Sequence, residues 1–412
     1  MKKIIAAAAG LMMVGTLATS ASAVESQFGG YWRTRMYTQI DFDGQDSGSF
    51  AVADTRTRLY YTAVFNENFK FVNKFEFDNT FGDNVGGDIG ADGKIFEVKN
   101  SYADFTTGMV RFKVGTQGAT VSRGFIFADD FSGVYAGVNA GDMALLQFAW
   151  IKVDEKEVTT TTTGTAFPVV DTNGDGIADT ASVTTMQDEV DIYSFLPVLT
   201  LSDALSVTPH FTYANTEGSD ADVWWLGADV DFSADAFSAW GTAIYQGGET
   251  ATGDDVSAWL LAAGGSVGMF HGEVFYATGD DDAADPDVET FTGAPGQSYY
   301  WSEIMGYGIF DNTVSAGSPA DKISNILAAN VGVKAKVSEK LTIGGDVWYA
   351  MLAEDNAAGE DDLGVEIDLK ATYAIMDNLK LDLVAAYLFA DDATGGGDED
   401  PIEVGARLSL SF

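Results

Sequence analysis

Four pairs of basic residues near the start of the chain have a spacing that could place them on one surface. The pairs are Arg33 and Arg35, Arg56 and Arg58, Lys70 and Lys74, and Arg111 and Lys113. Residues two or four positions apart share one face of a β-strand, and the opposite faces here carry large apolar or aromatic residues. Neighbouring strands would therefore align these eight cations as a basic ladder. Opposed by carboxylates across a gap, such a ladder sets up a field that orients dipolar solutes.

Two aspartates are the expected counterparts of this ladder. Asp129 and Asp130 end a connection that we expect at residues 118–130. If this connection folds inward, the two carboxylates face the arginines across a constriction. In the alternative, the basic residues only pair with neighbouring carboxylates and stiffen the wall; the candidates are Glu76, Glu97 and Asp104.

A second candidate site is an acidic, glycine-turned segment within residues 154–188. Asp171, Asn173, Asp175 and Asp179 follow a D-x-N-x-D-G-x-x-D pattern. Oxygen ligands at this spacing can wrap a calcium ion, although position 12 of the loop is Ser182 and not the glutamate of an EF-hand. We predict an extracellular calcium site here, with an acidic turn that binds nothing as the alternative.

The composition argues against most other chemistry. The chain has no cysteine and only two histidines, His210 and His271, neither of which lies in a recognisable nucleophile motif. A net charge of −40 excludes a nucleic-acid binder, while 46% hydrophobic residues exclude a disordered chain. We therefore expect no enzyme and no required cofactor.

The acidic residues are unevenly distributed. From Glu157 to Asp321 there are 27 acidic residues and no lysine or arginine. A negative entrance would concentrate cations, whereas the basic ladder acts in the opposite sense. The sequence therefore leaves the ion preference open.

The elements that would position these groups are strands. Residues 69–77, 363–373 and 379–389 alternate apolar and polar positions, which places opposite characters on the two faces of a strand. Eight short turns alternate with nine longer connections, which are mostly acidic and rich in glycine. This arrangement is typical of a transmembrane antiparallel up-and-down β-barrel. We predict an all-β barrel of about 18 strands, or 16 if one long loop was misinterpreted, with short periplasmic turns, long extracellular loops and the third loop folded into the lumen.

A large soluble β-sandwich or solenoid is the competing architecture. No repeat of 20–50 residues is visible, and no domain break divides residues 24–412. Residues 1–23 combine Lys2 and Lys3, an apolar stretch and an A-x-A site, so we predict a cleaved secretory signal peptide followed by one barrel domain.

The final strand carries a resemblance to a known family. Val404, Ala406, Leu408, Leu410 and Phe412 share one face, and the sequence stops on the aromatic residue. This ending resembles the signal that the barrel-assembly machinery reads in bacterial outer-membrane proteins.

The segments 28–37, 54–61 and 68–77 are similar to the N-terminal strands of Gram-negative general porins, in particular the homotrimeric porins of sulfate-reducing bacteria, and residues 111–117 look like the porin strand that leads into the third loop. The resemblance implies an integral outer-membrane homotrimer in contact with lipid, through which small hydrophilic solutes and ions diffuse passively. A substrate-selective channel is the alternative, and an adhesin or barrel hydrolase is a more distant one. The physiological solute is not determined.

Overall fold

The fold is described from a computed structural model of the chain. The structure describes residues 24–82, 96–154, 158–163, 181–186, 189–217, 221–281, 285–311 and 313–412. The expected signal peptide and the expected calcium loop lie outside these ranges. No helix in the described ranges is long and apolar enough to cross a membrane.

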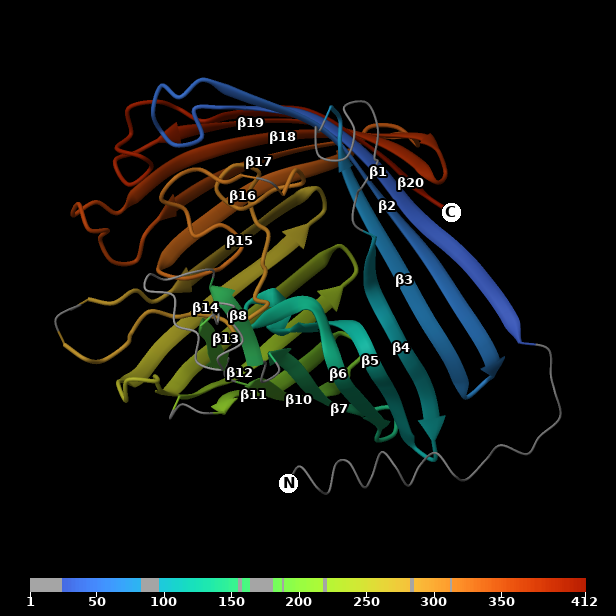
Figure 1. The fold of residues 1–412 in the computed structure, drawn as a ribbon. Coiled ribbons are helices and arrows are strands. Elements are labelled where there is room, and N and C mark those ends of the chain that lie inside the picture. Colours follow the sequence, from blue (N-terminus) through green and yellow to red (C-terminus); the bar gives the residue numbers. More distant parts are fainter. Residues whose placement is uncertain are drawn as a thin grey trace, which may run out of the picture.

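Within these ranges, eighteen antiparallel strands form one closed sheet (Figure 1). Each strand pairs with the next along the chain, β7 pairs with β10, and β20 returns to pair with β1. The strands are β1 Glu25–Ile40, β2 Ser49–Asn66, β3 Phe69–Thr80, β4 Glu97–Thr107, β5 Val110–Val121, β6 Phe127–Asn139, β7 Ala144–Asp154, β10 Glu189–Ser202, β11 Leu205–Glu217, β12 Asp222–Ala234, β13 Phe237–Glu249, β14 Asp255–Val267, β15 Phe270–Ala277, β16 Ile326–Lys336, β17 Leu341–Met351, β18 Asp362–Met376, β19 Leu379–Ala390 and β20 Ile402–Ser411. A separate hairpin, β8 Val158–Thr163 and β9 Ala181–Met186, lies between β7 and β10.

The closed barrel confirms the predicted fold class and the larger of the two strand counts. Tight turns at one end alternate with longer connections at the other, because consecutive strands are antiparallel throughout. Closure pairs the outermost strands and leaves no free sheet edge. The hydrogen bonds between Gly30 and Phe412, at 2.8 and 3.1 Å, complete this seam.

The two faces of the wall differ as the period-two pattern requires. Alternate residues point outward and are large, apolar and exposed; examples are Met36, Leu59, Phe71, Leu226, Leu261, Leu383 and Val404. An uninterrupted apolar exterior of this extent is far larger than the patches that water-soluble monomers expose. The remaining positions point inward and carry most of the charged and polar side chains.

The third connection is shorter than expected. Residues 118–130 were predicted to be a loop, but β5 and β6 remain paired up to Val121 and Phe127, and a 3₁₀ turn at Ser122–Gly124 leads through Phe125 and Ile126 to β6. The hairpin still turns into the lumen, as predicted for the third loop, because its tip contacts β12 and β13. A folded hairpin satisfies its own backbone groups inside the barrel, which an irregular loop would leave unpaired.

A second segment also occupies the lumen. The connection between β15 and β16 buries Phe291, Ile304, Met305, Phe310 and Ile323 almost completely. It bonds to the β5–β6 hairpin through the amides of Ala294, Ala128 and Ser298. The barrel therefore has an apolar core on the inside, built where these two segments meet.

Candidate functional site

The eight predicted basic residues lie together on the inner face of β1–β5. Register places Arg33 beside Arg56, and Tyr31 beside Arg58, on β1 and β2. Lys70 of β3 lies beside Asp104 of β4, which in turn lies beside Lys113 of β5. We call this surface the basic ladder, defined by Arg33, Arg35, Arg56, Arg58, Lys70, Lys74, Arg111 and Lys113.

Most of the ladder is paired with carboxylates from adjacent strands. Arg56 Nε donates to Asp78 at 2.9 Å, and Arg111 Nε donates to Asp104 at 2.8 Å. Arg58 donates to Glu76. The contacts to Glu76 and Asp104 are those of the alternative in which the basic residues pair along the wall. This pairing keeps a dense row of like charges stable, because an isolated cation on a partly buried wall is costly.

Tyrosine rings support two further members of the ladder. The Lys74 ammonium lies 5.3 Å from the centre of the Tyr60 ring, and the Lys113 ammonium lies 5.5 Å from that of Tyr135. Among the described residues, the eight ladder cations outnumber the five carboxylates that pair with them, which are Asp54, Glu76, Asp78, Asp104 and Asp311. The ladder therefore has more cationic groups than carboxylates that neutralise them.

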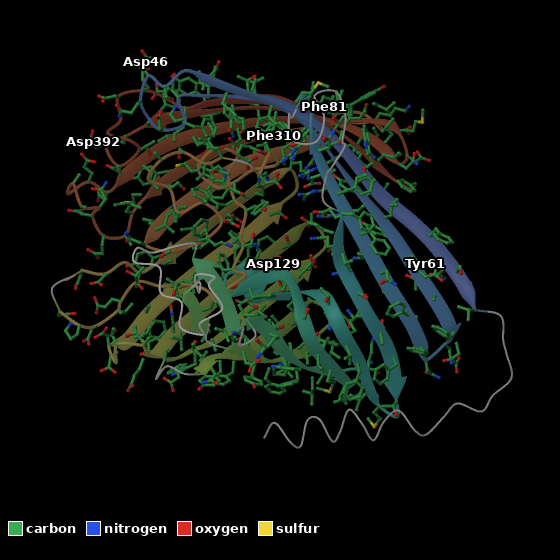
Figure 2. The ribbon with its side chains drawn as sticks, in the orientation of Figure 1. Asp46, Tyr61, Phe81, Asp129, Phe310 and Asp392 are labelled. Atoms are coloured by element: carbon green, nitrogen blue, oxygen red, sulfur yellow. The ribbon has the colours of Figure 1, made fainter. Side chains whose placement is uncertain are left out.

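The acidic residue that faces the ladder from a lumen segment is Asp311. It belongs to the β15–β16 connection and bonds to both Arg33 and Arg35. Arg35 also donates to the Phe310 carbonyl and, at 2.9 Å, to Asp54. Phe310 stacks on Tyr37 of β1 with ring centres 4.6 Å apart, and Figure 2 shows it inside the barrel near this wall.

Asp129 and Asp130 do not take the position that we expected. Asp130 forms an ion pair of 2.5 Å with Lys99 and accepts a hydrogen bond from Asn100 at 3.0 Å. Asp129 accepts the amide of Asp130, and Figure 2 places it on the inward hairpin. Both are strand residues of β6 beside β4 and β5. The hairpin tip lies further into the lumen than these two residues. The carboxylate that contacts Arg33 and Arg35 is therefore Asp311, from a different segment.

Glu366 of β18 anchors the β15–β16 connection. Its fully buried carboxylate accepts the amides of Ile304 and Met305, at 2.6 and 2.9 Å, and the Ser302 hydroxyl at 2.9 Å. Within the same turn, burial raises the pKa of the Glu303 carboxyl, which also accepts the Ile309 amide at 2.8 Å. These bonds hold the connection where Asp311 can meet the ladder.

Gly405 of β20 makes room for this arrangement. A Cβ atom at that position would lie 2.5 Å from the Phe310 ring and 2.5 Å from the Tyr37 Cβ. Any larger residue would displace the Phe310–Asp311 segment, since neither neighbour has free space to move into. The glycine therefore helps to determine how closely the connection approaches β1.

The inner wall divides into a solvated and a sealed part. On the ladder, the Lys70 and Arg111 side chains are 43% and 50% exposed, although Arg33 and Arg35 at its β1 end are buried. On β7, β10 and β11, by contrast, Ile151, Ile192 and Thr212 are at most 1% exposed. The two apolar residues belong to the same buried cluster as Phe125 and Ile126 of the hairpin tip. The hairpin tip therefore covers this sector of the inner wall, whereas the outer part of the ladder stays accessible to solvent.

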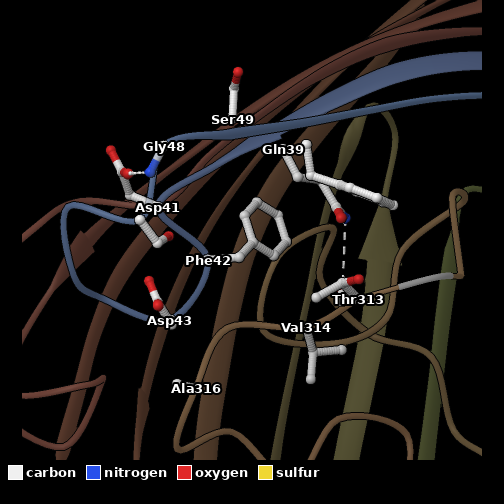
Figure 3. Close-up of a pocket in the computed structure, with 11 residues that line it drawn as sticks. Gln39, Asp41, Phe42, Asp43, Gly48, Ser49, Thr313, Val314 and Ala316 are labelled. Atoms are coloured by element: carbon white, nitrogen blue, oxygen red, sulfur yellow. Dashed lines mark hydrogen bonds between the residues drawn. The ribbon is translucent and has the colours of Figure 1, made fainter.

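Two cavities lie beside β1 and β2. One, of about 250 Å³, is lined by Arg33, Arg35, Asp54, Thr55, Arg56, Asp78, Asn79 and Thr80. The other, of about 410 Å³, lies beyond β1 between the β1–β2 connection and residues 313–316 (Figure 3). Gln39 spans it with a hydrogen bond of 3.3 Å to the Thr313 carbonyl, and Phe42 forms one side. Gln39, Arg35 and Arg33 lie on one face of β1, so the two cavities follow one line of side chains.

The described residues give no further catalytic or metal site. They contain no cluster of three or more potential metal ligands. His210 is buried on β11 without a hydrogen bond to either ring nitrogen, and His271 bonds Asp346 at 2.7 Å. Within the described part of the chain, neither histidine is paired with a serine.

Sequence reasoning missed Asp311, Phe310, Glu366 and Gly405. Each acts through a partner far away in sequence, and no local pattern marks these partners. One signal was available: the connection 279–322 combines its acidic start with Phe, Trp, Tyr, Ile and Met residues, a composition suited to a segment that is buried.

Comparisons with known proteins find similarity in structure. No protein-family model matches the sequence, and no curated protein matches it. Among solved structures, OpdQ of Pseudomonas aeruginosa is similar with a TM-score of 0.58 and 14% identity over 94% of this chain and 98% of that one. OccAB4 of Acinetobacter baumannii gives 0.60 and 11%, and the outer-membrane protein opdK of P. aeruginosa gives 0.61 and 9%, both with the same coverage. At these identities the similarity establishes the fold.

Proposed function

We propose that the chain is a Gram-negative outer-membrane porin through which small hydrophilic solutes and ions diffuse passively. The observation that carries this proposal is the solvated basic ladder inside a closed barrel whose exterior is apolar. A charged inner wall lets water and polar solutes pass, while an apolar outer wall suits lipid. Catalysis and a required cofactor have no place in this proposal.

Planar-bilayer recording of the purified protein tests the proposal. We expect stepwise single-channel currents and a reversal potential in a salt gradient that reports the ion preference. Protein that inserts but gives no steps would contradict it. A heat-unfolded sample serves as the control for leaks caused by detergent.

A substrate-selective channel is the second candidate. The β5–β6 hairpin and the β15–β16 connection both occupy the lumen. The exposed inner surface beside them includes the basic ladder, which has more cations than paired carboxylates. A structure of P. aeruginosa OpdK has been solved with vanillate, and we include small organic anions among the solutes to test. Liposome swelling separates the candidates: a general pore orders solutes by size alone, whereas a selective channel favours a carboxylate over an uncharged solute of equal size.

Location and assembly belong to the same proposal. We expect a cleaved signal at residues 1–23, recognition of the Phe412 strand by the barrel-assembly machinery, and a homotrimer in the outer membrane. Calcium binding by Asp171, Asn173, Asp175 and Asp179 stays a proposal as well. Membrane fractionation, chemical cross-linking and calcium titration of the folded protein test these points separately.

A further inference from the structure

We propose that Arg123 is a positioning residue that latches the β5–β6 hairpin to β12 and β13 and so keeps the aqueous route away from the inner face of β7, β10 and β11. The inference rests on the proposed function, since it concerns how the route is bounded. The latch joins β6 to β12 and β13, although β7, β10 and β11 lie between them along the wall. The hairpin therefore crosses the lumen as a chord.

The hairpin tip contacts β12 and β13 through hydrogen bonds, ion pairs and a cation–π contact. The Arg123 guanidinium donates to Asp231 at 2.8 Å and to the Thr242 hydroxyl at 3.1 Å. It lies 4.8 Å from the Trp240 ring centre, a cation–π geometry. Asp229 lies 3.8 Å away and accepts the Ser122 hydroxyl at 3.0 Å.

The strands β12 and β13 have no lysine or arginine of their own. No lysine or arginine occurs between Glu157 and Asp321, a stretch that contains β12 and β13. Asp229 is only 7% exposed and must be neutralised or hydrogen-bonded at that depth. Its carboxylate accepts the Thr242 hydroxyl at 2.6 Å as well as that of Ser122, and the lysine or arginine that lies beside it is Arg123 of the hairpin tip.

The backbone at the tip is strained in a way that the latch must hold. Ser122 and Arg123 have φ values of 47° and 58°, a region that residues with a side chain rarely adopt. Such conformations persist only where surrounding contacts over-determine them. The strain therefore favours release of the hairpin once the Arg123 contacts are removed.

The space behind the hairpin shows what the latch controls. Ile151, Ile192 and Thr212 on the intervening strands are almost fully buried, and Phe125 and Ile126 at the tip belong to the same apolar cluster as the two isoleucines. If the tip moves away, water reaches these inner faces. Release would thus open a second route along β7, β10 and β11, beside the one on the ladder.

Single-channel recording of Arg123→Ala tests the latch. Without the Arg123 contacts, the backbone strain at residues 122 and 123 favours release of the hairpin tip. We therefore expect the occupancy of a higher-conductance substate to rise about tenfold. Arg123→Lys should restore part of the latch, and Asp231→Asn should give a smaller change in the same direction. Lys336→Ala, at the exposed end of β16, is the matched control for loss of one cation.

Thiol accessibility gives a readout that general destabilisation would not reproduce. The chain lacks cysteine, so Thr212→Cys introduces one reporter on the sealed wall. We expect no labelling by a methanethiosulfonate in the otherwise unchanged protein and labelling in combination with Arg123→Ala. In the Arg123→Ala channel with Ser122→Cys and Asp229→Cys, a short reversible bis-thiosulfonate should restore the original conductance, and a reductant should reverse that effect.

The outcomes distinguish the latch from the channel itself. Original conductance in Arg123→Ala, or a reporter that stays protected, would overturn the latch while leaving the porin intact. Absence of current from the unchanged protein would instead overturn the proposed function. If Arg123→Ala fails to assemble, Asp231→Asn and Arg123→Lys decide, because both keep the hairpin tip charged and an unchanged substate in both would reject the latch.

Discussion

The ladder on β1–β5 and the sealed wall on β7, β10 and β11 are two sectors of the inner face of one sheet, yet much of the ladder is accessible to solvent and the sealed wall is buried. Both alternate in the same way with an apolar exterior, so the strands alone do not cause the difference. It arises from the β5–β6 hairpin, which covers β7, β10 and β11, and from the β15–β16 connection, whose described residues contact the ladder only at its β1 end through Phe310 and Asp311. In this barrel, the lumen segments determine which parts of the inner wall are accessible to water.

Release of the β15–β16 connection should have the largest effect on this difference in solvent access. Replacing Glu366 with alanine leaves two amides and one hydroxyl buried without an acceptor, at a cost of about 3 kcal/mol. We expect a large rise in conductance and a lower unfolding midpoint in heat-modifiability gels. Glu366→Gln should be milder because it retains one acceptor oxygen, and Asp355→Ala on the exposed β17–β18 connection should change neither value. Unaltered current in Glu366→Ala would show that the connection is held by other contacts.

Removal of positive charge from the basic ladder should have the next largest effect. Arg56→Gln combined with Arg111→Gln leaves Asp78 and Asp104 without their closest partners, so the route becomes more negative. The cation-to-anion permeability ratio should rise about twofold or more, measured by reversal potential. Lys336→Gln removes one cation away from the ladder and should leave the ratio unchanged. An equal shift in this control would mean that the ladder does not line the route.

The pH dependence of the Glu303 turn sharpens the comparison further. Burial raises the pKa of Glu303, so its neutral form favours the packed turn. That contribution is complete below the ordinary pKa of about 4.5 and is lost as the pH rises through the raised value. The charges of Lys370, Glu366 and Arg407 also act on the Glu303 carboxyl, and Asp368 accepts the Glu303 amide at 3.3 Å.

The turn that contains Glu303 should therefore fluctuate more as the pH rises above about 4.5, and the noise of the single-channel current should increase. The substitution Glu303→Gln should remove that dependence, because its amide does not ionise. A pH profile that is identical in both proteins would assign the effect to another group.

The smallest effect is expected at Asp130. Its partners are Lys99 and Asn100, and a partly exposed ion pair contributes at most about 1 kcal/mol. Asp130→Asn should therefore change conductance and ion preference little in bilayer recordings. A large shift in reversal potential would instead support the sequence prediction that Asp130 faces the arginines across the constriction.

The sequence allowed the barrel and the ladder to be predicted because both follow from local alternation. Arg33 and Arg35 share a face through their spacing alone, and neighbouring strands align them with Arg56 and Arg58 once the order is sequential. The partner of Arg35 could not be found in this way. Asp311 reaches it through a connection whose path depends on Glu366 and Gly405, residues more than 50 positions away along the chain, and on packing that no periodicity records.

The prediction for residues 118–130 shows a related limit. Glycine and acidic residues there indicated a loop, but strand pairing continues almost to the tip. The tip residues Phe125 and Ile126 find an apolar environment only inside the assembled barrel. Tertiary contacts thus extend a hairpin that local composition would end earlier.

The β1–β20 seam has a consequence for the timing of folding. The reciprocal bonds between Gly30 and Phe412 join residues at nearly the greatest separation the chain allows, which makes their encounter slow. Until β20 has paired with β1, a partly folded barrel carries two unpaired edges that can capture other chains. Closure is therefore a late and concentration-sensitive event, and a chain shortened before β20 should aggregate even though its other strands are intact.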